Sequence, residues 1–447
     1  MWKMNNDRIA VIDNKGHNFT YRQINKVSEA CKKQLGDRCV IYFKSTKHSI
    51  ADIVYYIALI EAKYIVIMVD NELPQLEHDR NINNFRPKYI YENGNFTKAN
   101  MSVGNFTPHK DLALVIPTSG TTGESKFACI SYKNIQSSMT SIVKFQKITK
   151  EDRAILNLPM FYIFGLSIIH SQLAAGGSIY TCEDCQPYSM QFWREADKYN
   201  CTSFSHTSTM YSLMKKFGTS VIIPKNFRYF AQSGSLFPVE LQDYYSDLCK
   251  KFNISFYLMY GATEATSRMA YLPPEDFFRR RYSVGKAIPA GRITLDEDTN
   301  EIIYKGNNVC MGYAKTFFDL KEPFEPNNGV LHTGDIGKKE DGYLYIIGRL
   351  KRNVKIYDLN INMDVVEQKI SDYKHKNCIV DFFNNYLYIM INGDYDINDI
   401  INYLYTEHIH IDVNHTRFLT GEIIYNNNTK KDYQAFREQC KRSFANE

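Results

Sequence analysis

The 447-residue sequence lacks any run of about 18 uninterrupted apolar residues, the length that a membrane-spanning helix needs. Residues 1–8 contain no apolar segment of the kind found in secretory signal peptides. Basic residues are not concentrated anywhere, since 54 basic and 49 acidic side chains leave a net charge of only +5. A charge this small and dispersed disfavours nucleic acid as the main partner. Together these absences predict a cytoplasmic protein without a membrane span.

Cysteine is present, but it lacks the spacing of a metal site or a disulfide framework. The ten cysteines are scattered from Cys31 to Cys440. The only CxxC pair, Cys182 and Cys185, has no second pair and no neighbouring histidine. In a reducing compartment this distribution is typical of free buried thiols. We therefore expect no zinc site and no redox function.

The hydrophobic pattern alternates between helical and strand-like segments up to about residue 290. Thr20 and Gln23 form a capping-box pattern before a helix that extends to about Leu35. A second helical segment at residues 52–62 is followed by a continuous apolar run at residues 64–69, which suits a buried parallel strand. This alternation predicts an α/β fold with mostly parallel sheets.

From residue 301 onward the pattern changes to short strands with turn signals, such as the turn at residues 325–329. After residue 351 a helix near residues 363–373 and strands near 378–383 and 386–392 are expected. We therefore predict a large N-terminal domain at residues 1–349, with a β-rich subdomain at about 290–349. A small α+β domain is predicted at residues 350–447.

A loop rich in glycine and hydroxyl side chains follows the apolar run at residues 112–116. Its glycines let backbone N–H groups turn toward anionic oxygens, its hydroxyls add donors, and its final lysine adds a positive charge. The spacing is not that of a Walker A loop. A solvated turn is the common alternative, but the preceding strand and the lysine favour phosphate binding. The loop consists of Thr118, Ser119, Gly120, Thr121, Thr122, Gly123, Glu124, Ser125 and Lys126.

Further motifs follow this loop in a fixed order. The series resembles that of the adenylate-forming superfamily, which includes acyl- and aryl-CoA ligases, nonribosomal peptide adenylation domains and luciferase-like enzymes. The resemblance extends along most of the chain, and it implies a large N-terminal domain followed by a mobile C-terminal lid. The motifs are residues 157–165, 232–238, the Tyr-Gly-Ala-Thr-Glu sequence at 260–264, 332–335 with 341–343, and 348–349.

In this superfamily a carboxylate attacks the α-phosphorus of ATP, so two anions must be brought together by cations and preorganised donors. The resemblance implies that Thr118 to Gly123 and Lys126 bind phosphates. It also implies that Glu264 binds Mg²⁺ and that Thr263 binds the α-phosphate. The remaining nucleotide contacts implied by the resemblance are Tyr260, Gly234 and Ser235 at the adenine, and Asp335 and Arg349 at the ribose or phosphate oxygens.

The resemblance places a catalytic lysine near the C-terminus, where Lys430 would bridge the acyl carboxylate and the α-phosphate. Thr429 occupies a position where the family has glycine, and Lys431 is the alternative ligand if the register shifts by one residue. Lys351 matches the hinge about which the lid rotates before coenzyme A reacts. Asp358 replaces a glycine near the expected pantetheine route, so the first half-reaction is the better supported one.

The acid itself is less clearly specified by the sequence. Nonribosomal domains for α-amino acids have an aspartate where Tyr162 stands, and a phenol forms no such ion pair. An apolar pocket favours a fatty, branched short-chain or aryl acid, although each of these side chains is also typical of ordinary core packing. The predicted pocket residues are Tyr162, Gly165, His206 and Met259, together with Phe161, Phe164, Leu166 and Ser235.

Three hypotheses remain at this point. The leading one is an ATP- and Mg²⁺-dependent ligase that joins a carboxylic acid to coenzyme A. The second is an enzyme of the same first step that loads a carrier protein. The third is a nucleotide-binding homologue without turnover, to which the departures at Ser125, Asp358 and Thr429 point. The oligomeric state is left open.

Overall fold

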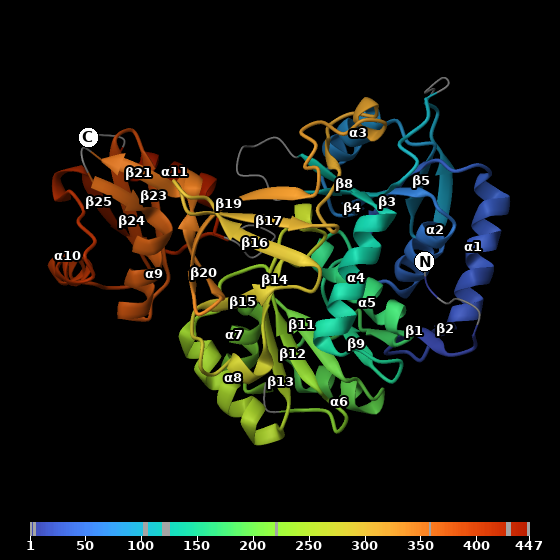
Figure 1. Cartoon of the computed structure of the whole chain (residues 1–447), viewed down its shortest axis with the longest axis horizontal. Coiled ribbons are helices and arrows are strands. Elements are labelled where there is room, and N and C mark those ends of the chain that lie inside the picture. Colours follow the sequence, from blue (N-terminus) through green and yellow to red (C-terminus); the bar gives the residue numbers. More distant parts are fainter. Residues whose placement is uncertain are drawn as a thin grey trace. The chain divides into compact units, whose positions relative to one another are not determined.

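A computed structural model describes residues 2, 6–101, 106–118, 126–219, 222–356, 359–425 and 431–444. These residues form a mixed α/β structure with large sheets, which confirms the predicted fold class (Figure 1). The chain divides into two compact units, Met1–Ile293 with Tyr304–Leu331, and Thr294–Ile303 with His332–Glu447. The predicted domain boundary between residues 349 and 350 stays a prediction.

The helices of the first unit are α1 (Tyr21–Leu35), α2 (Ile50–Glu61), α3 (Gln75–Phe85), α4 (Tyr132–Gln146), α5 (Ile163–Ala175), α6 (Met190–Lys198), α7 (Ser208–Lys216) and α8 (Val239–Phe252). Its strands are β1 (Ile9–Asp13), β2 (Asn18–Thr20), β3 (Val40–Ser45), β4 (Ile65–Asp70), β5 (Tyr89–Glu92), β6 (Asn95–Lys98), β7 (Leu112–Pro117), β8 (Phe127–Ser131), β9 (Arg153–Leu156), β10 (Ser178–Thr181), β11 (Ser203–His206), β12 (Tyr229–Gln232), β13 (Ser255–Tyr260), β14 (Ala270–Leu272), β15 (Ser283–Ala287) and β18 (Gly312–Ala314).

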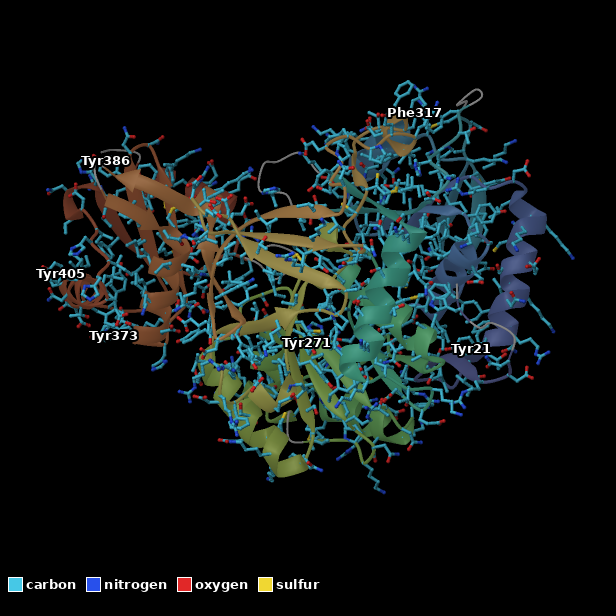
Figure 2. All side chains as sticks on the ribbon, in the orientation of Figure 1. Tyr21, Tyr271, Phe317, Tyr373, Tyr386 and Tyr405 are labelled. Atoms are coloured by element: carbon cyan, nitrogen blue, oxygen red, sulfur yellow. The ribbon has the colours of Figure 1, made fainter. Side chains whose placement is uncertain are left out.

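The predicted first helix is confirmed together with its capping box. The backbone N–H of Gln23 donates to the Thr20 hydroxyl at 3.2 Å, and the Thr20 N–H donates to the Gln23 side chain at 2.7 Å. These two bonds satisfy donors that the first turn of a helix leaves without intrahelical partners. On the buried face of α1, the hydroxyl of Tyr21 donates to the Gly177 carbonyl at 2.7 Å (Figure 2).

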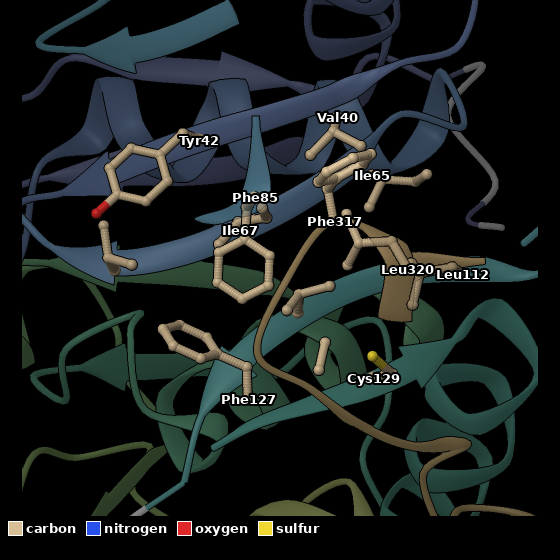
Figure 3. Close-up of a cluster of buried hydrophobic side chains, with 13 residues drawn as sticks. Val40, Tyr42, Ile65, Ile67, Phe85, Leu112, Phe127, Cys129, Phe317 and Leu320 are labelled. Atoms are coloured by element: carbon tan, nitrogen blue, oxygen red, sulfur yellow. The ribbon is translucent and has the colours of Figure 1, made fainter. Parts of the chain in front are cut away.

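One sheet of the first unit has the order β18-β8-β7-β4-β3-β5-β6. Strands β7, β4, β3 and β5 are parallel, and β8 returns antiparallel to β7. Phe127 begins β8, and its ring lies 4.9 Å from that of Phe85 within a cluster of buried apolar side chains (Figure 3). Burial of such a side chain stabilises the fold by about 1.5–3 kcal/mol. This packing anchors the strand that immediately follows the glycine-rich loop.

A second sheet contains the parallel neighbours β13, β12, β11, β9, β10 and β1, with β14 antiparallel to β13. Parallel strands end at the same edge of a sheet, and ligands of open α/β sheets bind outside that carboxyl edge. Four adjacent strands therefore bring their final residues, or the residues just after them, to one edge. These residues are Asn157 after β9, His206 in β11, Gln232 in β12 and Tyr260 in β13.

Each of three strands contains residues of both units. These strands are β16 (Gly291–Leu295), β17 (Glu301–Gly306) and β19 (Val330–Glu340). The other elements of the second unit are β20 (Tyr343–Arg349), β21 (Asn353–Ile356), β22 (Leu359–Asn362), α9 (Met363–Lys374), β23 (Cys378–Phe383), β24 (Tyr386–Ile391), α10 (Ile397–Thr406), β25 (Thr416–Thr420) and α11 (Tyr433–Ser443).

The second unit has a small core of its own. Strands β23 and β24 are antiparallel, and β25 is parallel to β24. Val366 of α9, Ile389 of β24 and Leu404 of α10 are fully buried in one apolar cluster. The predicted helix near residues 363–373 and both predicted strands are confirmed within one or two residues.

Two further sequence-based expectations concern cysteine and the membrane. All ten cysteines are free and buried, as predicted. Within the described part of the chain, no helix has the length and hydropathy needed to cross a membrane.

Candidate active site

The glycine-rich loop connects the antiparallel strands β7 and β8. Strands β7 and β8 pair up to Pro117 and Phe127, and the N–H and hydroxyl of Thr118 both donate to the Lys126 carbonyl, at 2.9 and 3.0 Å. The two ends of the loop are thus held together at the carboxyl end of β7. The predicted ligands Ser119, Gly120, Thr121, Thr122 and Gly123 lie outside the described residues.

Lys126 contacts acidic and aromatic side chains at the end of this hairpin. Its Nζ lies 2.8 Å from Glu325 Oε2 and 5.1 Å from the centre of the Tyr313 ring. The Tyr313 hydroxyl donates to Glu264 Oε1 at 3.5 Å, and Tyr313 comes from β18, which pairs with β8. The structure therefore places the predicted phosphate ligand Lys126 and the predicted metal ligand Glu264 next to the same tyrosine.

The Tyr-Gly-Ala-Thr-Glu motif lies in the connection between β13 and β14. Thr263 and Glu264 form a single 3₁₀ turn, and the Met269 N–H donates to the Tyr260 carbonyl at 2.8 Å, which closes the connection. A Cβ on Gly261 would lie 1.7 Å from the Ser267 carbonyl oxygen. Glycine is required at this position because two backbone segments pass closer than any side chain allows.

Asn308 holds this connection, although nothing in the sequence pattern marked it. Its Nδ2 donates to the carbonyls of Ala265 at 2.7 Å and Arg268 at 2.8 Å, and its Oδ1 accepts from the Tyr304 hydroxyl at 2.7 Å. The side chain is buried with its amide hydrogen bonds satisfied. An asparagine in this role has the same sequence signature as one in an exposed turn, so only the fold identifies it.

The predicted adenine-side residues follow β12. Gly234 has φ +88°, a left-handed conformation that favours glycine. The exposed Ser235 hydroxyl accepts from the Ser208 N–H at 3.2 Å, while its carbonyl accepts from the Gln232 side chain at 2.7 Å. These bonds hold the turn at the carboxyl edge of the second sheet.

The predicted pocket residues lie at the same edge. Met259 is buried in β13, and Tyr162 directly precedes α5. The Tyr162 hydroxyl is buried without a hydrogen-bond partner among the described residues, and burial raises its pKa to about 12. Burial lowers the pKa of His206 to about 3, so this imidazole is neutral near pH 7. The backbone of Gly165 lies close to that of Pro159, since a Cβ on Gly165 would be 2.4 Å from the Pro159 carbonyl oxygen.

Asp335 and Arg349 belong to the second unit and face each other across the antiparallel pair β19 and β20. Arg349 Nε lies 3.3 Å from Asp335 Oδ1. The preceding turn is held by Glu301, whose Oε1 accepts from the Gly334 N–H at 2.8 Å. The structure thus brings these two predicted ribose ligands together. Their convergence with Lys126 and Glu264 stays a prediction.

Lys351 is exposed in a short 3₁₀ turn, Leu350–Arg352, after β20. Lys430 and Asp358 lie outside the described residues. Lys431 is described, and its Nζ lies 2.5 Å from Glu367 Oε2. The Tyr433 hydroxyl donates to the same carboxylate at 3.0 Å.

The profile of the AMP-binding enzyme family matches residues 2–314. This match covers more than half of the chain, and the chain therefore belongs to the AMP-binding enzyme family. The membership confirms the resemblance to the adenylate-forming superfamily that the motifs indicated.

Curated relatives match part of the chain. Oxalate–CoA ligase from Arabidopsis thaliana is 32% identical over 255 residues, which are 54% of this chain and 48% of that protein. A 2-succinylbenzoate–CoA ligase from Oceanobacillus iheyensis is 31% identical over 246 residues, or 54% of this chain and 50% of that protein. The chain thus spans about half the length of the curated relatives it matches.

Solved structures share the fold over nearly the whole chain. o-Succinylbenzoate CoA synthetase (MenE) from Bacillus subtilis, in complex with the acyl-adenylate intermediate OSB-AMP, has a TM-score of 0.78 at 19% identity, covering 97% of this chain and 95% of that chain. ATP-bound MatB from Rhodopseudomonas palustris has a TM-score of 0.77 at 19% identity, covering 98% and 96%. The fold is that of an adenylate-forming enzyme, with a large N-terminal domain and a C-terminal subdomain.

Proposed function

We propose that this chain activates a carboxylic acid with ATP, forms an acyl-adenylate and pyrophosphate, and then joins the acyl group to coenzyme A. The observation that carries the proposal is the arrangement of Lys126 and Glu264 around Tyr313, at the end of the glycine-rich hairpin. Family membership supports the same chemistry, as do relatives named as ligases that join oxalate or 2-succinylbenzoate to coenzyme A.

In the first step, a carboxylate oxygen of the acid bonds to the α-phosphorus, and the bond from that phosphorus to the pyrophosphate oxygen breaks. The hairpin loop and Lys126 would bind the phosphates, and Thr263 would donate to the α-phosphate. Glu264 fits a magnesium site, because Mg²⁺ is commonly bound by one or two protein carboxylates together with phosphate and water oxygens. The metal would neutralise charge on the phosphate oxygens when bound.

Two further contacts with the nucleotide are part of this proposal. Asp335 would accept hydrogen bonds from the ribose hydroxyls, and Arg349 would donate to ribose or phosphate oxygens. Lys430 would bridge the two reacting anions. The ion pair between Lys431 and Glu367 supports this choice, because it gives Lys431 a structural partner within its own unit. Lys351 would be the hinge that allows the lid to present a second face to the thiol.

Tyr162, Gly165, His206 and Met259 would form the acid pocket, which we assign to a fatty, branched short-chain or aryl acid. The ten free thiols are consistent with a cytoplasmic enzyme of acyl metabolism. Loading of a carrier protein is the alternative second half-reaction, because Asp358 stands where the family has glycine. A nucleotide-binding homologue without turnover is the further alternative.

ATP–pyrophosphate exchange across a panel of carboxylic acids tests the proposal. We expect exchange that depends on at least one acid and on Mg²⁺. Exchange that no acid stimulates would leave the nucleotide-binding homologue as the better assignment. Adding coenzyme A or a phosphopantetheinylated carrier protein to the active acid then separates the two acceptors.

A further inference from the structure

Arg268 is a buried arginine at the end of the connection between β13 and β14, with 3% of its surface exposed. Its Cζ lies 4.0 Å from the centre of the Phe164 ring. Nε donates to the Met259 sulfur at 3.1 Å, and Nη1 donates to the carbonyl and hydroxyl oxygens of Ser267. Each of these partners is neutral, and a thioether is a weak acceptor.

No carboxylate in the described part of the chain pairs with the Arg268 guanidinium, and its Nη2 donates to none of the described residues. The contrast with Arg352 is clear, because that partly buried arginine pairs with Asp364 at 2.5 Å and with Glu367 at 2.8 Å. A buried charge without an opposite charge is costly. Burial lowers the pKa of Arg268 to about 9, which leaves it cationic near neutral pH.

The backbone around Arg268 is held in an unusual conformation. Ser267, the preceding residue, has φ +97°, which is rare for a residue with a side chain. The Arg268 carbonyl accepts a hydrogen bond from Asn308. The Arg268 Cα lies 2.9 Å from the position that a Cβ on Gly261 would occupy. Backbone strain of this kind is concentrated at functional sites. The backbone that carries the Arg268 guanidinium is therefore already fixed before a ligand binds.

Two of the side chains that Arg268 contacts, Met259 and Phe164, are already assigned to the acid pocket. Met259 precedes the last residue of β13, and Phe164 lies in the first turn of α5. Tyr162, which directly precedes that helix, has a buried hydroxyl without a partner among the described residues. A cation packed against apolar side chains suits a substrate that is mostly apolar but carries an anionic group.

We propose that Arg268 binds a second carboxylate of the substrate, so that the activated acid is a dicarboxylic acid whose other carboxylate is adenylated. This inference rests on the proposed function and narrows its substrate. A planar guanidinium matches the two oxygens of a carboxylate, and Nη2 of Arg268 has no acceptor among the residues that the structure describes. A buried site that is built to hydrogen-bond a substrate group discriminates strongly against analogues that lack it.

The test compares straight-chain and aromatic dicarboxylic acids with their monomethyl esters in ATP–pyrophosphate exchange. We expect wild type to favour a diacid over its monoester by about 100-fold in kcat/KM. Arg268→Met should lower kcat/KM for the diacid by about 10- to 100-fold without lowering that for the monoester. Arg268→Lys should retain part of the preference. Arg194→Met, which removes an exposed positive charge on α6, is the control and should change neither value.

Calorimetric binding of the same acids, with a non-hydrolysable ATP analogue present, separates this inference from the proposed function. Equal exchange with diacids and monoesters in wild type would overturn the inference and leave the ligase proposal in place. Diacid binding that falls in Arg268→Met, without exchange by any acid, would support the anion site and overturn the ligase proposal. Absence of both binding and exchange would overturn both. The wild-type comparison remains decisive even if Arg268→Met does not fold.

Discussion

Lys431 and Glu367 form an ion pair inside the second unit, with 2.5 Å between Nζ and Oε2. Arg352 and Tyr433 bind the same carboxylate, so Glu367 connects three elements of this unit. Because Lys431 is one of two adjacent lysines in the motif predicted to supply the catalytic cation, this pairing gives the two lysines different expected roles.

We expect Lys430→Ala to reduce ATP–pyrophosphate exchange by about 100-fold or more while ATP affinity changes little, because the proposed role of this cation is to act where two anions meet. Lys431→Ala should instead lower the free energy of unfolding by about 1–3 kcal/mol, since Glu367 loses a charged partner. Exchange assays, ATP calorimetry and urea unfolding of both variants measure these effects. A larger loss of exchange in Lys431→Ala, at unchanged stability, would reverse the two roles.

Gly261→Ala should destabilise the first unit, because its Cβ would lie 1.7 Å from the backbone oxygen of Ser267. The connection between β13 and β14 would have to open, and we expect a loss of about 2–4 kcal/mol together with loss of exchange activity. Thermal unfolding measures the change. Gly421→Ala is the control, since its nearest neighbour is the sulfur of the flexible Met390 side chain at 3.2 Å. Equal melting temperatures for wild type and Gly261→Ala would contradict the close contact.

Glu325→Gln should strengthen ATP binding, because Glu325 pairs with Lys126, the predicted phosphate ligand, and would compete with the triphosphate for it. The effect should be small, up to about fivefold in Kd, since an ion pair with exposed partners contributes about 0–1 kcal/mol. Lys126→Ala should weaken binding by about tenfold or more. Titration calorimetry at low and high salt checks both values, with Glu322→Gln as the control for charge. Unchanged affinity in Lys126→Ala would remove this lysine from the phosphate site.

Folding stability should fall as the pH is lowered below about 6.5, partly because of His170. This side chain is buried, its Nε2 lies 2.7 Å from the Tyr56 hydroxyl, and burial lowers its pKa to about 3. Between these two pKa values the unfolded chain binds a proton that the folded chain does not, so the free energy of unfolding decreases with falling pH.

From about pH 7 to about pH 5 this one histidine should account for a loss of about 2 kcal/mol. Urea unfolding of wild type and His170→Gln at both pH values measures the contribution, and the variant should lose less stability on acidification. The exposed His410 provides the matched control, His410→Gln. An unchanged pH dependence in His170→Gln would show that the buried imidazole titrates normally.

Much of the fold was predictable from local sequence patterns. The capping box at Thr20 and Gln23 and the strand at residues 378–383 were located within a residue, because hydrogen bonds between neighbouring residues and local apolar patterns determine them. The glycine-rich loop was also recognisable, and the strand predicted before it is confirmed. The packing of Arg268 against Met259 and Phe164 was not predictable, because these residues come from separate segments whose packing no local pattern encodes.

The sequence by itself determined several of the helices and strands, the family, and the residues that are predicted to bind phosphate and metal. Backbone propensity and short-range hydrogen bonds act between neighbours in the chain, so they can be read from the sequence. Only the tertiary structure decided that Arg268 is buried without a carboxylate partner among the described residues, while Arg352 has two. Whether a charge is neutralised depends on which distant side chains pack around it, and that is a property of the folded chain alone.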